Sequence, residues 1–103
     1  MPDTSVPQSQ TATLSNPTPH QFQTSGGVDQ TLNITNQSVQ EVASVMIQCS
    51  SWENPPSMPI TIDPFKNYFT MTKFGGAPMV ITNVTNPNNP ATVQVTLNTA
   101  HQG

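Results

Sequence analysis

The sequence predicts an all-β protein, a small antiparallel β-sandwich of six or seven strands. Short runs of alternating apolar and polar residues recur from Val28 onward, and clusters of Pro, Gly, Asn and Ser separate them. Short strands at regular spacing are typical of an antiparallel sandwich and unlike the alternating strands and helices of a parallel sheet. With 103 residues and 33% hydrophobic content, the chain has apolar material for one small core. We therefore expect a single β domain over residues 28–103.

The first strand is expected between Val28 and Thr35. Val28, Leu32 and Ile34 would share one face of an extended segment, and polar side chains occupy the other face. This alternation is typical of a strand that is buried on one side. The run Asn36–Ser38 then breaks the pattern.

The segment Val39–Cys49 fits two patterns. As a strand it would place five residues on one face: Val39, Ala43, Val45, Ile47 and Cys49. As a helix it would place another five on one stripe, namely Val39, Val42, Ala43, Met46 and Ile47, and Ser38 with Glu41 would form a capping box. Four of the eleven residues are β-branched, which costs side-chain freedom in a helix. The sequence therefore favours a strand and leaves the helix open.

Two further β-rich stretches follow. Residues Met58–Ile62 alternate in polarity before a turn at Asp63-Pro64. The run Tyr68–Phe74 is aromatic and rich in Thr, and Gly75-Gly76 ends it. We expect the aromatic residues of this region to pack in the core or at a sheet edge: Phe65, Tyr68, Phe69 and Phe74.

The C-terminal region predicts a hairpin. The runs Met79–Thr85 and Ala91–Leu97 have strand-like composition, and a loop of Asn and Pro residues joins them. We therefore expect these two strands to pair with each other.

Residues 1–27 differ in composition from the rest of the chain. They combine four prolines with Ser, Thr and Gln, and Asp3 is their only charged residue. Such a segment contributes little apolar surface to offset its ordering entropy. We expect an extended N-terminal arm that reaches onto neighbouring subunits, with packing of the arm on its own domain as the alternative.

Charge is scarce throughout the chain. Only 7% of the residues are charged and the net charge is −3, so no basic surface is available for phosphates, and nucleic-acid binding is not expected. No apolar run approaches the roughly 20 residues of a membrane span, and the N-terminus has no signal-peptide pattern. Cys49 is the only cysteine, which excludes an intramolecular disulfide and favours a buried thiol.

The chain offers few residues for chemistry. His20 and His101 have no second metal ligand at a suitable spacing, and the paired glycines do not form a phosphate-binding loop. No serine lies in a nucleophile elbow. We therefore expect neither an enzyme nor a metal or organic cofactor. Three Asn-x-Ser/Thr triplets, which begin at Asn33, Asn36 and Asn83, are attributed to chance.

Trp52 is the best candidate for recognition. It lies beside Glu53 and Asn54 in a segment that two prolines stiffen, and an exposed indole with polar neighbours can stack on a sugar. Tyr68 could provide a second stacking ring, and Phe22 is a candidate interface residue of the arm. The alternative for Trp52 is that its ring folds back and closes one end of the sandwich.

These observations favour a structural protein over an enzyme. The assembly that fits best is a virion, with this chain as a minor capsid, decoration or vertex protein of a phage-like virus, assembled in the host cytoplasm. The strand pattern resembles an immunoglobulin-like or jelly-roll-like sandwich. Two alternatives stay open: a lectin-like module that binds carbohydrate, and a pilus or filament subunit with a donated strand, each at the cell surface or secreted.

Overall fold

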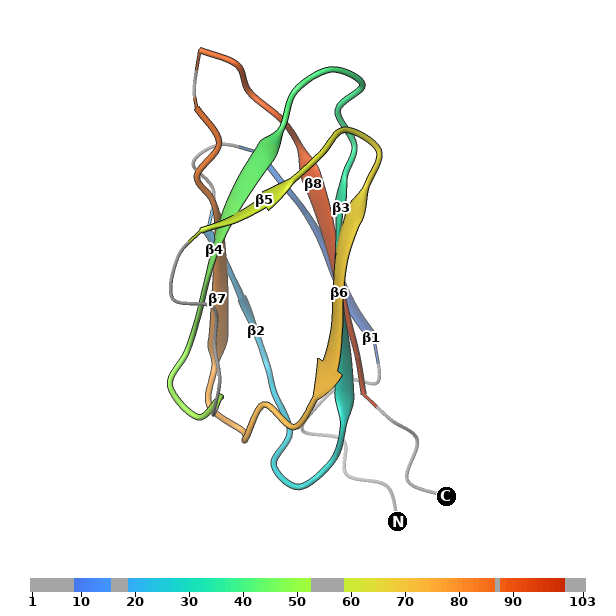
Figure 1. The fold of residues 1–103 in the computed structure, drawn as a ribbon. Coiled ribbons are helices and arrows are strands. Elements are labelled where there is room, and N and C mark those ends of the chain that lie inside the picture. Colours follow the sequence, from blue (N-terminus) through green and yellow to red (C-terminus); the bar gives the residue numbers. More distant parts are fainter. Residues whose placement is uncertain (1–8, 16–18, 53–58, 87, 100–103) are drawn as a thin grey trace.

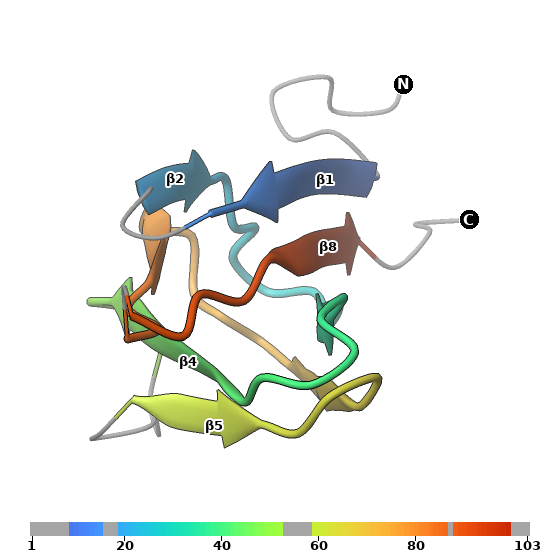
Figure 2. The ribbon, with the colours of Figure 1, turned by 90° about the horizontal axis from the view of Figure 1, so that it is seen from above.

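The protein is all-β in the computed structural model, which describes residues 9–15, 19–52, 59–86 and 88–99. Within these ranges eight strands, rather than the predicted six or seven, form two four-stranded antiparallel sheets, one in the order β1-β8-β3-β6 and the other in the order β2-β7-β4-β5. The strands are β1 (Ser9–Leu14), β2 (Pro19–Phe22), β3 (Gln30–Asn36), β4 (Ala43–Cys49), β5 (Ile60–Ile62), β6 (Asn67–Thr72), β7 (Met79–Asn83) and β8 (Val93–Thr99). The two sheets face each other in a sandwich-like arrangement (Figures 1 and 2).

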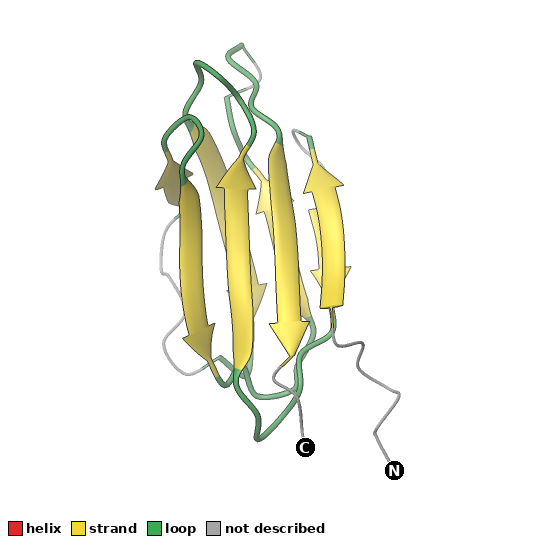
Figure 3. Cartoon of the chain, turned by 90° about the vertical axis from the view of Figure 1, so that its right-hand side faces the viewer, coloured by secondary structure: helices red, strands yellow, loops and turns green. Residues whose placement is uncertain are grey.

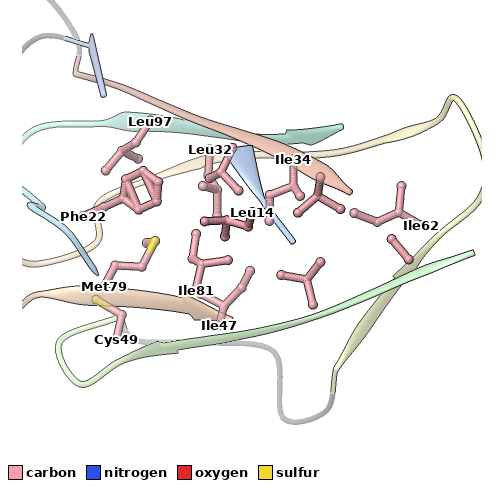
Figure 4. Close-up of a cluster of buried hydrophobic side chains, with 14 of the residues drawn as sticks. Leu14, Phe22, Leu32, Ile34, Ile47, Cys49, Ile62, Met79, Ile81 and Leu97 are labelled. Carbon is pink, nitrogen blue, oxygen red and sulfur yellow. The ribbon is translucent and has the colours of Figure 1, made fainter. Parts of the chain in front are cut away.

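The core lies between the two sheets, where alternate side chains of each strand meet. In β3, β4 and β7 every second residue is buried, as the period of a strand requires. Figure 4 shows Leu32, Ile34 and Leu97 of one sheet directed toward Ile47 and Ile81 of the other. The apolar face predicted for the first strand is confirmed at Leu32 and Ile34.

The ambiguous segment is a strand over Ala43–Cys49, and its four predicted inward residues from Ala43 to Cys49 are buried. Val39 and Val42 are exposed, so neither contributes to a core-facing helical stripe. The Ser38 hydroxyl accepts a hydrogen bond from the Glu41 backbone N–H at 3.0 Å. The N-terminal half of the predicted capping box therefore forms, but it stabilises a turn before β4.

The extended arm expected over residues 1–27 is not confirmed, because two of the eight strands come from this region. β1 pairs with β8 and β2 pairs with β7, and Leu14 and Phe22 are both buried in the core. Gln10 donates from Nε2 to the Gln23 carbonyl at 2.8 Å and accepts from the Gln23 N–H at 2.9 Å. Although this region has few apolar residues, backbone pairing and the buried Leu14 and Phe22 hold it on the domain. Residues 1–8 and 16–18 lie outside the described ranges.

The predicted C-terminal hairpin is wrong, because β7 and β8 belong to different sheets. The connection crosses the roughly 10 Å between the sheets after Asn83, whose side chain is buried. Asn83 Nδ2 donates to the carbonyls of Leu14 at 3.0 Å and Ala91 at 2.7 Å, and Oδ1 accepts from the Thr85 N–H at 3.0 Å. This side chain bonds backbone groups at the place where the chain leaves the sheet. Asn36 acts in the same way after β3, with Nδ2 bonded to the carbonyls of Glu41 and Ile62.

Candidate functional site

Trp52 lies three residues after the end of β4 and packs against the domain. Its side chain is 8% exposed, and its ring meets Phe74 edge-on, with centroids 4.9 Å apart and an interplanar angle of 82°. The Trp52 backbone N–H donates to the Cys49 carbonyl at 3.2 Å, which closes a tight turn after the strand. Most of the indole is therefore buried against Phe74.

A polar junction holds Phe74 and Trp52 in place. Ser51 Oγ donates to the Phe74 carbonyl at 2.6 Å and accepts from the Ala77 N–H at 2.8 Å. Gly75 has φ of +93°, and a Cβ at this position would lie 2.6 Å from the Ser51 carbonyl oxygen. Cys49 is buried beside the carbonyls of Phe74 and Ala77, as its sequence context predicted. The junction therefore fixes the β4 end against the segment that follows β6.

A groove of about 500 Å³ lies beside β6, next to this junction. Seven residues line it: Asp29, Trp52, Tyr68, Thr70, Met71, Thr72 and Lys73. Tyr68, Thr70 and Thr72 are half-buried because they point inward, at the side of the sandwich where β6 forms the edge of its sheet (Figure 1). The groove is therefore lined by hydroxyl-bearing side chains of one strand and by Trp52.

Electrostatics in the groove are weak. Lys73 Nζ lies 3.3 Å from Asp29 Oδ1, and the two side chains are 61% and 47% exposed, so this ion pair contributes at most about 1 kcal/mol. Burial raises the pKa of the Tyr68 phenol, which keeps this hydroxyl protonated and able to donate and accept hydrogen bonds. Within the described ranges, no three His, Cys, Asp or Glu residues lie close enough together to hold a metal ion. Hydrogen bonding and packing are the chemistry that this groove offers.

The five residues predicted for recognition or interface contact fall in different places. Trp52 and Tyr68 both line the groove, although they are distant in the sequence. Phe22 is fully buried on β2, opposite Met79 of β7. Glu53 and Asn54 lie outside the described residues. Sequence reasoning missed the inward hydroxyls of β6, which the alternation of that strand could have revealed.

The opposite face of β6 presents apolar side chains to solvent. Phe69 is 59% exposed and Met71 is 62% exposed, and Phe65, which precedes the strand, is exposed too. The expectation of core or edge packing holds for the buried Phe74, whereas the outward rings of Phe65 and Phe69 do not pack in the core. Phe69 is exposed because side chains alternate along a strand, so residues 69 and 71 point to the outer face when Tyr68 and Thr70 point inward.

Phe69 and Met71 lie at the β6 end of a largely polar surface, which we call the polar face. It is the outer face of the β1-β8-β3-β6 sheet, seen from the front in Figure 3, and it has three rows of cross-strand neighbours. The rows are Ser9-Asn98-Thr31-Met71, Thr11-Thr96-Asn33-Phe69 and Thr13-Gln94-Thr35-Asn67. All of these side chains are exposed or half-buried, and none is charged.

No known protein family matches the chain, and neither curated proteins nor solved structures show a significant match. No helix in the described ranges is long and apolar enough to cross a membrane. The candidate sites therefore rest on the geometry of the groove, the β6 edge and the polar face.

Proposed function

We propose that the protein is a structural protein that docks against other protein subunits in a larger assembly. The observation that carries this proposal is the polar face, because three rows of uncharged side chains cover a whole four-stranded sheet. The described Asp, Glu and Lys residues all lie outside the eight strands: Asp29, Glu41, Asp63, Lys66 and Lys73. The polar face thus carries no charged side chain, and the described Asp, Glu and Lys residues lie in the connections between strands.

An uncharged polar surface suits burial in an interface. Removing a carboxylate or ammonium group from water costs several kcal/mol, whereas Thr, Asn and Gln can exchange water for hydrogen bonds across the interface. Interface centres are accordingly depleted in charged residues and enriched in aromatic residues and Met. Phe69 and Met71 at one border of the polar face have this composition.

The assembly that we favour is a virion, in which the chain would be a minor capsid, decoration or vertex protein. Composition and sandwich architecture support this assignment by analogy. In this proposal the sandwich is immunoglobulin-like or jelly-roll-like, and an N-terminal segment contacts neighbouring subunits. Assembly in the host cytoplasm follows from the same proposal.

A lysine substitution at the centre of the polar face tests the docking proposal. Thr96→Lys places a charge in the middle row, and Gln48→Lys places the same charge on the outer face of the other sheet as a matched control. We expect Thr96→Lys to weaken subunit association, measured as mass in solution over a wide concentration range, and Gln48→Lys to leave it unchanged. Equal association of both variants and the parent protein would reject the polar face as the docking surface.

Carbohydrate binding is a second candidate, which the groove favours because it brings Trp52 and Tyr68 together. Tyr68 would supply a ring and a hydroxyl, and the Asp29 carboxylate could accept hydrogen bonds from sugar hydroxyls. The test is a glycan array with the parent protein and Tyr68→Ala, and with Val84→Ala as a control at an exposed position away from the groove. Absence of any bound glycan with the parent protein would remove this candidate.

A further inference from the structure

The edge of β6 combines several features that no other described strand edge has. β6 is one of the two outer strands of its sheet, and its six residues include no charged residue, Pro or Gly. Lys66 and Lys73 are the only basic residues of the chain apart from histidine, and they stand immediately before and after this strand. Lysines at an edge or beside a hydrophobic strand restrict unwanted pairing. Here the two lysines mark both ends of the six-residue strand β6, so pairing along this edge would be confined to that segment.

The backbone of β6 leaves one set of groups on the outer edge. The Asn36 N–H donates to the Lys66 carbonyl at 3.0 Å, so the residues that bond β3 are Lys66 and every second residue after it. The N–H and C=O groups of Asn67, Phe69 and Met71 therefore point away from β3. An added strand would bond to these groups, as in peptide recognition by strand addition.

We propose that two copies of this chain join their sheets through β6, in an antiparallel pair with a two-fold axis at Thr70. This inference rests on the proposed assembly function and names the partner as a second copy. In this register Phe69 of each copy lies opposite Met71 of the other, and Thr70 lies opposite Thr70. Aromatic-sulfur contacts and Thr-Thr pairs both stabilise cross-strand neighbours. The exposed apolar side chains of β6 would thus cover each other in an isologous interface.

Charge also favours a second copy over an acidic peptide. Paired residues of antiparallel strands must lie on the same face, so the register that would oppose Lys66 to Lys73 is excluded, because it would also set Phe69 against Thr70. With the axis at Thr70, Lys73 lies opposite Asn67 instead. An acidic partner would find both lysines beyond the strand ends, and Lys73 is already paired with Asp29. The uncharged segment between the two lysines is instead suited to pair with the same segment of a second copy.

Cysteine cross-linking tests the axis. Thr70 would form a pair without backbone hydrogen bonds, where the Cα atoms lie about 4.5 Å apart, within the range that a disulfide spans. We expect Thr70→Cys to give a covalent dimer under mild oxidation. Thr72→Cys is the matched control, because it lies on the same face of the same strand but would face Tyr68 of the other copy. The native Cys49 is buried in both variants.

A second measurement tests the apolar contact without a disulfide. Phe69→Lys should raise the dissociation constant of the dimer about tenfold or more, since it removes both ring contacts and places a charge at the joined edge. Val84→Lys, at an exposed position beyond the end of β7, should leave it unchanged.

Each outcome decides the proposal. A Thr70→Cys dimer without a Thr72→Cys dimer, together with a weakened Phe69→Lys dimer, supports it. Association that Phe69→Lys leaves intact but Thr96→Lys weakens would overturn the β6 pairing and retain docking through the polar face. A monomer at every concentration, with no cross-link through Thr70→Cys, would overturn the pairing. Capture of an acidic peptide at the edge, with no dimer, would overturn the second copy as occupant.

Discussion

Replacing Asn83 by Ala should strongly destabilise the protein, because this one side chain satisfies several buried backbone groups. Its amide bonds to the carbonyls of Leu14 and Ala91 and to the N–H of Thr85. Each of the three buried groups left without its partner costs about 1 kcal/mol or more, so the total is about 3 kcal/mol. Because domains of this size have stabilities of about 5 to 15 kcal/mol, the loss is a large fraction of the whole.

The assay is urea unfolding followed by circular dichroism, with Asn98→Ala as the control. Asn98 lies exposed on β8 in the polar face, and its replacement should change stability by no more than about 0.5 kcal/mol. For an m-value of about 1.5 kcal/mol/M, Asn83→Ala should lower the midpoint by about 2 M relative to the parent protein. Equal midpoints for the two variants would refute the idea that the Asn83 amide holds the crossing between the sheets.

Three further predictions concern the groove and its supports. Gly75→Ala should destabilise the protein more than Gly27→Ala, because both have positive φ but only a Cβ at Gly75 would meet Ser51, at 2.6 Å; thermal unfolding would compare them. Because burial raises the pKa of Tyr68, the native state holds its proton more tightly than the unfolded state, so stability should fall as the pH rises above about 10, and Tyr68→Phe should remove this part of the decline. Trp52→Ala should cost about 3 to 5 kcal/mol in urea unfolding, whereas a loss below 1 kcal/mol would contradict its burial.

Local periodicity predicted the central strands of the fold because burial on one side leaves a period of two in the sequence. Residues 32 and 34 of β3 and the inward residues of β4 follow this rule. The turn before β4 shows why the helix pattern arose. Ser38 does accept the Glu41 N–H, but such local bonds form in turns as well as in helices.

Edge strands and sheet crossings could not be predicted in the same way. β1 has one buried side chain, Leu14, and one partly buried Ala12 against the core, and it is otherwise held by backbone pairing, which leaves little apolar pattern in the sequence. The run after Asn83 is compatible with both a hairpin and a crossing, because the choice depends on the buried amide of that residue. The groove was partly predicted, since Trp52 and Tyr68 were singled out, but their proximity depends on how β6 faces the end of β4.

Because charged residues are scarce, the four edge strands of the two sheets need another protection against unwanted pairing with other chains. Charged side chains are a common protection of edges, and none lies within a described strand here. β5 has three residues and β2 has four, so these edges offer short pairing surfaces. β1 and β6 have six residues each, and only β6 is bracketed by lysines and carries exposed Phe and Met side chains. A slip of two residues toward the C-terminus would oppose Lys73 to Phe69. The lysines thus border the pairing segment and disfavour this shifted register, as expected if the edge joins copies in a defined geometry.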